Sequence, residues 1–453
     1  MFDKSIFKAY DIRGLYPEQV NADLAFKLGQ AFAVFMKKDS GKNQLDLVVG
    51  QDMRLSSPEL FKSLTDGIVS QGVNVVDVGL VSTPSFYFSV AKHGFDGGIM
   101  VSASHNPPQY NGFKMVRAES LPISGETGIM QLSDMIDADY IESEVRGEIR
   151  KLDNIIDEHV EYALGYADLS KIKPFKVVVD TANAMGGPIF EKLFEKLPCE
   201  LIKLNFELDG NMPSHEADPL KDKNNKQIQD KVREVGADFG IVLDGDADRI
   251  FFIDNTGKTI EPAMIRGILA QIFLKDNPGA TICYDIRPGK ITIDMIEEAG
   301  GKPVVTKVGH SLIKEKAREV DAVFAGESSG HFFLKMPFGI FEMPMIMALK
   351  ILEKFSEVDK SVSEQIAPLD KYFHSGEINF SVEDKQAVFD RLKEKYGENL
   401  KYDFDGFSFE WSDWWFNVRA SNTGNKVRLN LESITDEVMQ EKRDEVIRVI
   451  KGA

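Results

Sequence analysis

The sequence predicts an α/β protein: three tandem, similar βα domains with mostly parallel mixed sheets, plus a distinct C-terminal α+β domain, around a central cleft. Short apolar segments alternate with longer amphipathic segments up to about residue 355, a pattern typical of βαβ units. After about residue 365, strand-like segments follow one another with few helical segments between them. The expected domains are residues 1–150, 151–248, 249–365 and 366–453.

The first expected domain begins with an amphipathic helix. Leu24, Leu28 and Phe32 recur every four residues, which places them on one helical face, and Asn21 is expected to cap the helix. A second helix is expected to begin at Pro58, because Ser57 suits the N-cap and Pro58 suits the first helical position. The strands of this domain are expected at 45–50, 73–78 and 99–101.

The later domains show the same kinds of segment. Strands are expected at 175–180, 201–204 and 239–243 in the second domain, with helices at 188–197 and 225–235. A third series is expected to begin with a strand at 250–253 and to continue with strands at 280–284, 304–307 and 322–325 and helices at 262–274, 290–299, 311–319 and 343–355. The last domain has expected strands at 377–380, 406–411, 415–420 and 426–431 and expected helices at 385–396 and 436–451. Its three tryptophans are expected to pack in its core and at its edges, namely Trp411, Trp414 and Trp415.

Composition and charge restrict the class of function. The formal net charge of −18 argues against a nucleic-acid partner, because phosphates require a basic surface. Cys199 and Cys283 lie far apart, so neither a disulfide framework nor a zinc site is implied. The N-terminal segment has no signal-peptide pattern, and no apolar run is long enough to span a membrane. We therefore expect a cytoplasmic protein whose partners are small molecules, with no nucleic acid and no membrane.

Residues 101–115 combine an apolar strand end with a polar loop that contains Ser104, His105 and Lys114. Two consecutive prolines end the strand and prevent an immediate helix. A hydroxyl at the carboxyl end of a strand lies where α/β folds bind ligands. Ser104 is therefore a candidate phosphoryl carrier, and His105 is placed to orient it. Taken alone, the loop is equally consistent with a polar turn whose hydroxyls satisfy backbone groups.

A cluster of aspartates follows the strand expected at 239–243. Asp244, Asp246 and Asp248 alternate with small residues, and such a group of anions is costly unless a cation neutralises it. Carboxylate oxygens favour Mg²⁺, or Ca²⁺ in a larger cage. An EF-hand is excluded, because its glycine and its final glutamate would fall on Arg249 and Asn255. The alternative is a solvated acidic turn, which the preceding apolar strand disfavours.

Two further polar segments are weak signals when taken alone. Residues 326–331 place Glu327 and Ser329 between glycines, where they can accept and donate hydrogen bonds to sugar hydroxyls, although a structural turn would use the same residues. Residues 419–428 combine arginine, hydroxyls and an amide with a glycine-containing turn, which suits a phosphate clamp but lacks the Walker A pattern.

Together, these four segments resemble, in order and over essentially the whole chain, the motifs of the α-D-phosphohexomutase family, most closely its phosphomannomutase/phosphoglucomutase branch. The N-terminal segment Tyr10–Gly14 also resembles a family motif. The resemblance implies a mutase that interconverts hexose 1-phosphate and hexose 6-phosphate through a phosphoserine and a 1,6-bisphosphate, with Mg²⁺. The resemblance and the chemistry of these segments suggest the following roles: catalysis by Ser104, Lys114, His331, Arg13, His310 and Arg249; substrate binding by Tyr10, Arg287, Glu327, Ser329, Arg419, Ser421, Asn422 and Thr423; and metal binding by Ser104, Asp244, Asp246 and Asp248.

Some positions depart from the family pattern. Gln51 replaces a usual arginine, Arg287 replaces a common lysine, and residues 338–342 and 424–425 differ from the usual segments. The last two departures border the sugar and phosphate segments, so the preferred hexose stays open between mannose and glucose. Three alternative functions remain: a phosphoglucosamine mutase, a non-catalytic sugar-phosphate binder on the same scaffold, and a metal-dependent phosphatase.

Overall fold

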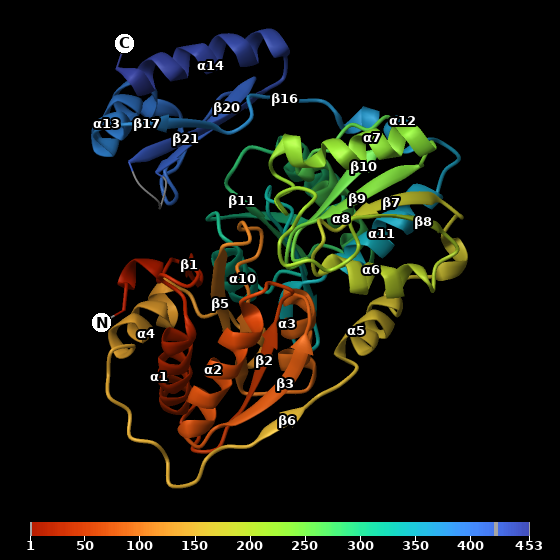
Figure 1. Ribbon diagram of the computed structural model, residues 1–453. Coiled ribbons are helices and arrows are strands. Elements are labelled where there is room, and N and C mark those ends of the chain that lie inside the picture. Colours follow the sequence, from red (N-terminus) through yellow and green to blue (C-terminus); the bar gives the residue numbers. More distant parts are fainter. Residues whose placement is uncertain (1, 421–424, 453) are drawn as a thin grey trace. The chain divides into compact units, whose positions relative to one another are not determined.

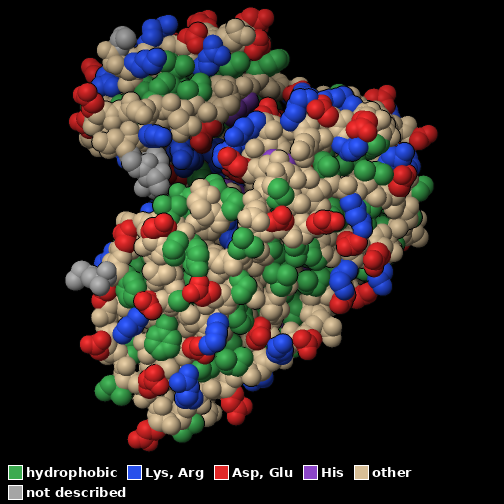
Figure 2. Space-filling model, viewed as in Figure 1, with side chains coloured by type: hydrophobic (Ala, Val, Ile, Leu, Met, Phe, Trp, Pro, Cys, Tyr) green, Lys and Arg blue, Asp and Glu red, His purple; other side chains and the backbone are tan. Residues whose placement is uncertain are grey.

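The computed structural model describes residues 2–420 and 425–452. The chain forms two compact units, and both combine strands with helices (Figure 1). Unit 1 comprises Met1–Ile260 and Ser329–Gln365, and unit 2 comprises Glu261–Ser328 and Ile366–Ala453. Within the described residues, no helix is both long enough and apolar enough to cross a membrane. Acidic and basic side chains are interspersed over the visible face of each unit (Figure 2).

Unit 1 begins with a six-stranded mixed sheet in the order β1-β5-β4-β2-β3-β6. The central strands pair in parallel, whereas β5 pairs antiparallel with both β4 and β1. The strands are β1 (Ile12–Leu15), β2 (Asp46–Gln51), β3 (Asn74–Leu80), β4 (Gly97–Val101), β5 (Tyr110–Arg117) and β6 (Ile149–Lys151). The helices are α1 (Ala22–Ser40), α2 (Ser57–Ser70), α3 (Thr83–Lys92) and α4 (Met130–Met135).

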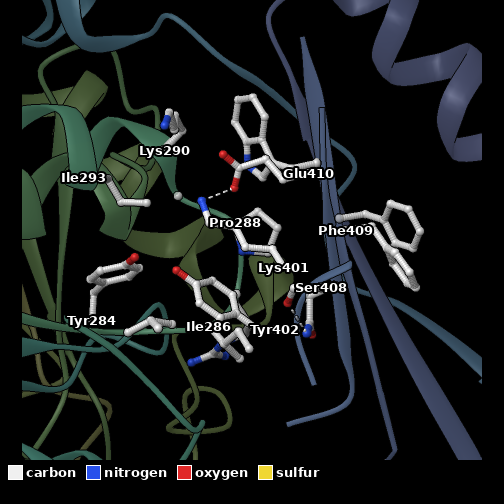
Figure 3. Close-up of a pocket in the computed structure, with 16 residues that line it drawn as sticks. Tyr284, Ile286, Pro288, Lys290, Ile293, Lys401, Tyr402, Ser408, Phe409 and Glu410 are labelled. Atoms are coloured by element: carbon white, nitrogen blue, oxygen red, sulfur yellow. Dashed lines mark hydrogen bonds and ion pairs between the residues drawn. The ribbon is translucent and has the colours of Figure 1, made fainter. Parts of the chain in front are cut away.

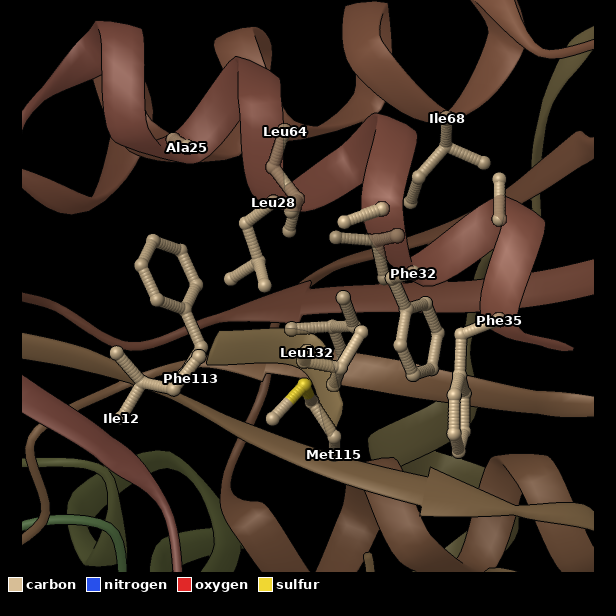
Figure 4. Packing of buried hydrophobic residues seen from close by; sticks show 14 of the residues in the cluster. Ile12, Ala25, Leu28, Phe32, Phe35, Leu64, Ile68, Phe113, Met115 and Leu132 are labelled. Atoms are coloured by element: carbon tan, nitrogen blue, oxygen red, sulfur yellow. The ribbon is translucent and has the colours of Figure 1, made fainter. Parts of the chain in front are cut away.

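The core of this sheet is formed by the helical faces that the sequence pattern predicts. Figure 4 shows Leu28 and Phe32 of α1 facing Phe113 and Met115 of β5, and these side chains are almost fully buried. The Asn21 side chain caps α1 by accepting a hydrogen bond from the backbone N–H of the third helical residue. A well-packed layer of this kind fixes the position of β5, from which the site is built.

Three expectations for this sheet are wrong. The segment expected as a loop throughout residues 101–115 becomes strand β5 at Tyr110, so Lys114 lies on a strand. Arg13 lies on strand β1, opposite Gly112, although no strand is expected before residue 45. The N-cap of α2 is Ser56 in place of Ser57. A hydrophobic pattern does not reveal these two strands, because they contain the charged residues Lys114 and Arg13. Both side chains pair with acidic residues of unit 1.

The second sheet of unit 1 has the order β10-β9-β7-β8. Its strands are β7 (Lys176–Asp180), β8 (Glu200–Leu204), β9 (Phe239–Leu243) and β10 (Ile250–Asp254), and its helices are α5 (Ile155–Leu164), α6 (Gly186–Phe194) and α7 (Lys226–Val235). Strand β10, expected to open a third series, pairs antiparallel with β9 and so closes a hairpin around residues 244–249. Unit 1 also contains β14 (Phe332–Met336), β15 (Gly339–Glu342), α11 (Pro344–Ser356) and α12 (Val362–Ile366).

Unit 2 contains two groups of strands. In the first, β11 (Thr281–Asp285) pairs in parallel with β12 (Lys302–Thr306) and β13 (Phe324–Gly326), accompanied by α8 (Pro262–Asp276), α9 (Lys290–Glu298) and α10 (His310–Glu319). The second is an antiparallel sheet of β16 (Phe373–His374), β17 (Ile378–Ser381), β18 (Leu400–Tyr402), β19 (Phe407–Glu410), β20 (Trp414–Ala420) and β21 (Lys426–Ser433), with α13 (Lys385–Tyr396) and α14 (Asp436–Lys451). The rings of Trp411 and Trp414 stack 4.0 Å apart in its core, as expected.

Candidate active site

The candidate active site of unit 1 is centred on Ser104, in the loop between β4 and β5. Ser104 is buried and has a φ of 51°, a left-handed conformation that is uncommon for a residue other than glycine. Its backbone N–H donates to Ser102 Oγ at 3.0 Å. Its hydroxyl donates to Asp244 Oδ2 at 3.2 Å and lies 3.2 Å from His105 Nδ1. The loop therefore directs the hydroxyl at the acidic hairpin.

The acidic hairpin between β9 and β10 places three carboxylates together. One oxygen from each of Asp244, Asp246 and Asp248 lies within 4.8 Å of the others, and all three residues are buried. Asp244 Oδ1 accepts the backbone N–H groups of Asp248 and Arg249, each at 3.1 Å. Gly245 is required here, because a Cβ at this position would lie 2.4 Å from the carbonyl oxygen of Ser104. The absence of a side chain lets the hairpin reach the serine loop.

Lys114 supplies the closest compensating charge. Its Nζ donates to Asp246 Oδ2 at 2.5 Å and to Asp248 Oδ2 at 2.6 Å. Burial opposes the protonated form, but the charges of the two aspartates prevail and hold the pKa of Lys114 well above its usual value. In these contacts Lys114 is therefore a fixed cation across the neutral pH range.

Two further cationic or titratable groups surround the aspartates. His331 Nε2 lies 3.1 Å from Asp248 Oδ1, and its Nδ1 lies 3.0 Å from Ser329 Oγ. Arg249 Nε lies 3.6 Å from Asp244 Oδ2. Burial raises the pKa of Asp244 well above its usual value, and the charges of Asp248 and Asp246 add to this effect. Burial would also raise the pKa of Asp248, but Lys114 and His331 hold it well below its usual value.

Arg13 approaches the serine loop from β1. Its Nη1 donates to Asn106 Oδ1 at 2.5 Å, and its guanidinium pairs with Asp11. Burial, together with the charges of Arg249 and Arg13, lowers the pKa of His105 well below its usual value. The imidazole beside the serine hydroxyl is therefore neutral. Tyr10, the remaining predicted residue of this part, is half-buried and lies two residues before the start of β1.

The aspartate cluster suits a divalent metal ion. Asp246 Oδ1 is buried, and the described residues offer it no hydrogen-bond partner. An anionic oxygen in that position is costly unless a cation binds it. Three clustered carboxylates are hard ligands of the type that Mg²⁺ prefers. The residues present therefore fit the metal that the sequence predicts.

Unit 2 contains a second group of predicted residues. Arg287 Nε donates to Asp285 Oδ2 at 2.5 Å, and Glu327 Oε1 accepts the backbone N–H of Gly309 at 2.7 Å, next to His310 at the start of α10. Ser421, Asn422 and Thr423 lie outside the described residues.

The arginines near β20 and β21 of unit 2 share one acid. Arg419 lies 3.3 Å and Arg428 lies 3.5 Å from separate carboxylate oxygens of Glu377. The Nε atoms of both arginines are buried, and neither has a hydrogen-bond partner within residues 2–420 and 425–452. Burial, followed by the charge of Arg287, lowers the pKa of Arg419. These two arginines thus carry more positive charge than their shared glutamate neutralises, and they have unused donors, an arrangement that suits an anionic ligand.

A cavity of about 50 Å³ lies beside Arg287 in unit 2. Figure 3 shows Tyr284 and Lys290 on one side of it, and Phe409 and Glu410 on the side of the antiparallel sheet. Pockets for small organic ligands usually measure about 300–1,000 Å³. This cavity is therefore too small to hold a hexose phosphate.

Three residues of the unit 1 site were not predicted from the sequence. Thr83, at the start of α3, donates to Asp246 through its hydroxyl and through its backbone N–H. Arg54 is buried and contacts the serine loop. Glu342 has a carboxylate oxygen within 4.8 Å of ligand atoms of Asp248 and His331. Thr83 follows the end of β3, so its position at a strand end was an available signal. For Glu342 the sequence carries no local signal.

Comparison with known proteins agrees with these features. Four family models for phosphoglucomutase/phosphomannomutase match the chain, with α/β/α domains I, II and III at residues 4–139, 157–257 and 261–372 and the C-terminal domain at residues 377–449. Three α/β domains and a distinct C-terminal domain are therefore confirmed.

Relatives match over the full chain. A Xanthomonas campestris protein named "Phosphohexose mutases" is 40% identical, covering 98% of this chain and 99% of its own length. A Vibrio cholerae phosphomannomutase is 37% identical, covering 100% and 99%. The crystal structure of a phosphoglucomutase/phosphomannomutase family protein from Burkholderia thailandensis has a TM-score of 0.90 and 35% identity, covering 100% and 98%. The chain described here belongs to the phosphoglucomutase/phosphomannomutase family.

Proposed function

We propose that this protein is a phosphohexomutase that interconverts hexose 1-phosphate and hexose 6-phosphate, with mannose or glucose as the sugar. The observation that carries the proposal is the hydroxyl of Ser104, which lies 3.2 Å from Asp244 within a buried group of compensated charges. A strained serine at a strand end beside three carboxylates is well suited to carry a phosphoryl group. The names of the full-length relatives agree with this activity.

The proposed reaction has two transfers. In the first, the bond between Ser104 Oγ and phosphorus breaks while a bond forms between phosphorus and the free hydroxyl oxygen of the hexose phosphate. The proton of that hydroxyl passes to a basic group of the site, for which His331 is the candidate in unit 1 and His310 is a candidate in unit 2, whereas the cations Lys114 and Arg13 contribute positive charge. The product is a hexose 1,6-bisphosphate. In the second transfer, Ser104 Oγ takes the other phosphoryl group, and the released oxygen regains a proton.

Charge compensation is the main task of the surrounding residues. Asp244, Asp246 and Asp248 would hold Mg²⁺ together with an oxygen from Ser104 or its phosphate. When bound, Mg²⁺ would offset negative charge on the group in transfer. Arg249 contributes positive charge beside Asp244.

The residues of unit 2 are proposed to bind the part of the substrate that does not react. Arg287 and Arg419 would bind the distal phosphate with Ser421, Asn422 and Thr423, while Glu327 would accept hydrogen bonds from sugar hydroxyls. Tyr10 and Ser329 of unit 1 are proposed to contact the substrate as well. A phosphate-centred site of this kind accepts either end of the sugar, as the two transfers require.

A coupled mutase assay tests the proposal. The purified protein is given mannose, glucose and glucosamine 1-phosphates in turn, with Mg²⁺ and a catalytic amount of hexose 1,6-bisphosphate. We expect the 6-phosphate of mannose or glucose to form, and removal of Mg²⁺ with a chelator to stop its formation. A preference for glucosamine phosphate would identify the phosphoglucosamine mutase. Steady release of inorganic phosphate would identify a phosphatase, and binding without turnover would identify a sugar-phosphate binder.

A further inference from the structure

The backbone at Ser104 requires support from outside its own loop. A left-handed conformation is costly for a serine and persists only where the surrounding structure imposes it. Two prolines follow at positions 107 and 108, and they remove backbone N–H groups that would otherwise tie the loop together. The carbonyl groups of this loop therefore need donors from another part of the chain.

One side chain provides these donors. The Nη2 of Arg54 donates to the carbonyl oxygens of Ser104 at 2.8 Å and of Asn106 at 2.6 Å. Its Nη1 donates to the carbonyl oxygens of Pro107 at 2.8 Å and of Tyr110 at 3.0 Å. Four carbonyls of one loop thus converge on a single guanidinium.

The fifth donor of Arg54 fixes the guanidinium itself. Its Nε donates to Asp52 Oδ2 at 3.2 Å, and Asp52 Oδ1 accepts the hydroxyl of Ser57 at 2.7 Å. The backbone N–H of Asp52 donates to the carbonyl of Val101 at 3.0 Å, which attaches the support to the end of β4. A guanidinium has five N–H donors in a planar fork, and each of the five has an acceptor here.

This arrangement is specific to arginine. Arg54 is 1% exposed, so solvent cannot replace any of its hydrogen bonds. A lysine at this position would keep the charge, but its three donors cannot serve five acceptors in one plane. The buried carbonyls would then lose partners, and Ser104 would lose the contact that holds its peptide group.

We propose that Arg54 is a positioning residue for phosphoryl transfer, holding Ser104 in the left-handed conformation that directs its hydroxyl at Asp244. This inference rests on the proposed function, because it assigns to Arg54 the geometry of the phosphoryl carrier. Arg54 does not contact the reacting atoms. Its effect is exerted through the carbonyl group of Ser104 and through the carbonyl groups that follow it in the loop.

The test compares Arg54→Lys and Arg54→Met with the wild-type protein. Misplacing a reacting group by about 1 Å costs about 100-fold in rate, so we expect kcat to fall about 100-fold in Arg54→Lys, and further in Arg54→Met. KM for the hexose monophosphate should stay within about threefold, because neither variant removes a substrate contact. The rate at which labelled hexose 1,6-bisphosphate phosphorylates Ser104 should fall by the same factor as kcat.

A variant of matched stability separates positioning from general destabilisation. Leu352→Ala opens a cavity beneath α11 of the same unit, a helix that contributes no residue to the candidate site. Even if this control variant melts at a temperature as low as that of Arg54→Lys, its kcat and its phosphorylation rate should stay within about threefold of the wild-type values. If Arg54→Met does not fold, Arg54→Lys and Asp52→Asn decide the test, and Asp52→Asn is expected to lower kcat less than Arg54→Lys.

Two outcomes distinguish the possible failures. If Ser104→Ala abolishes turnover while folded Arg54→Lys phosphorylates and turns over at the wild-type rate, the positioning role of Arg54 is wrong and the proposed function stands. If Ser104→Ala itself turns over normally, the proposed function fails and the inference fails with it.

Discussion

The two candidate binding regions differ in how their charges are balanced. In unit 1, Lys114 contacts Asp246 and Asp248, His331 lies beside Asp248, and Arg249 lies beside Asp244. In unit 2, Arg419 and Arg428 share Glu377, and the Nε of each is left without a hydrogen-bond partner among the described residues. In unit 1 the charged side chains are paired with one another beside a strained serine. In unit 2 the two arginines have N–H donors that no described residue accepts.

This difference indicates that the two regions have different tasks, with phosphoryl transfer in unit 1 and phosphate binding in unit 2. A covalent carrier needs precise placement and a compensated environment, because small displacements of the reacting atoms are costly. A site that receives either phosphate of a reorienting substrate needs positive charge and free donors more than fixed partners. We therefore expect substitutions in unit 1 to lower stability and kcat, and substitutions in the arginine group of unit 2 to raise KM.

The largest effect is expected for Lys114→Met, which removes the cation between Asp246 and Asp248. Breaking a buried ion pair by removing one partner costs about 3–5 kcal/mol, because the remaining charges are left uncompensated. Loss of this charge-compensating group should also lower kcat at least ~100-fold. Urea unfolding and the mutase assay measure both effects.

The exposed pair of Lys62 with Asp66 provides the control for Lys114. Because exposed pairs contribute little, Lys62→Met should change stability by less than about 1 kcal/mol and leave kcat unchanged. If Lys114→Met kept the stability and turnover of the wild-type protein, compensation of the aspartates by Lys114 would contribute neither to folding nor to catalysis.

A smaller effect, on a different parameter, is expected for Arg419→Met. A charge-assisted hydrogen bond contributes about 1.5–3 kcal/mol, which corresponds to a rise of about 10- to 100-fold in KM for the hexose phosphate. The rate at which the bisphosphate phosphorylates Ser104 at saturation should change much less. Arg443→Met, which removes a pair with Asp444 on α14, is the matched control. An unchanged KM in Arg419→Met would contradict the anion-binding role of unit 2.

The pH dependence of local stability should also differ between the units. In unit 1, burial lowers the pKa of His159 to about 3, and its ring stacks on Phe88 and lies 3.0 Å from Ser85 Oγ. The unfolded chain, with a histidine pKa near 6.5, binds a proton that the folded unit does not, so stability falls as pH falls below 6.5. Between pH 6.5 and 5 the loss should be about 2 kcal/mol, and His159→Gln should remove it.

Unit 2 should show the opposite slope because of Glu432. Burial raises the pKa of Glu432 to about 7. Two hydrogen bonds partly oppose this rise, because Glu432 Oε2 accepts the backbone N–H of Lys290 at 2.9 Å and the indole N–H of Trp415 at 2.8 Å. The folded unit retains a proton that the unfolded chain loses above pH 4.5, so stability is lost as pH rises through 7. Glu432→Gln should abolish a loss of about 1–2 kcal/mol between pH 5 and 7.

Hydrogen exchange separates the two slopes, because protection is measured peptide by peptide. Peptides from α5 should become less protected as the pH falls from 6.5 to 5, and peptides from β21 should become less protected as the pH rises from 5 to 7. Parallel slopes in both units, or slopes unaffected by the two substitutions, would contradict the assignment of these groups.

The sequence predicts the elements that depend on local patterns. Helices α1 and α14 are predicted well because their apolar spacing and caps are local, and the aspartate cluster is recognised because Asp244, Asp246 and Asp248 are close in sequence. Strand β10 is assigned to the wrong series, because periodicity does not indicate which sheet a strand joins.

Contacts between distant residues cannot be predicted in this way. Lys114 is buried only because two aspartates more than 130 residues away compensate it. The role proposed for Arg54 depends on carbonyl groups 50 or more residues away, and carbonyl groups have no sequence signature.

Phosphate on Ser104 is the most direct test of the central claim. The protein is incubated with labelled hexose 1,6-bisphosphate and Mg²⁺, the site of the label is mapped by mass spectrometry, and unlabelled hexose monophosphate is then added. We expect one phosphate on Ser104, and we expect it to move to the sugar within one turnover. Undiminished mutase turnover with no label on Ser104, or with the label on another residue, would contradict the account.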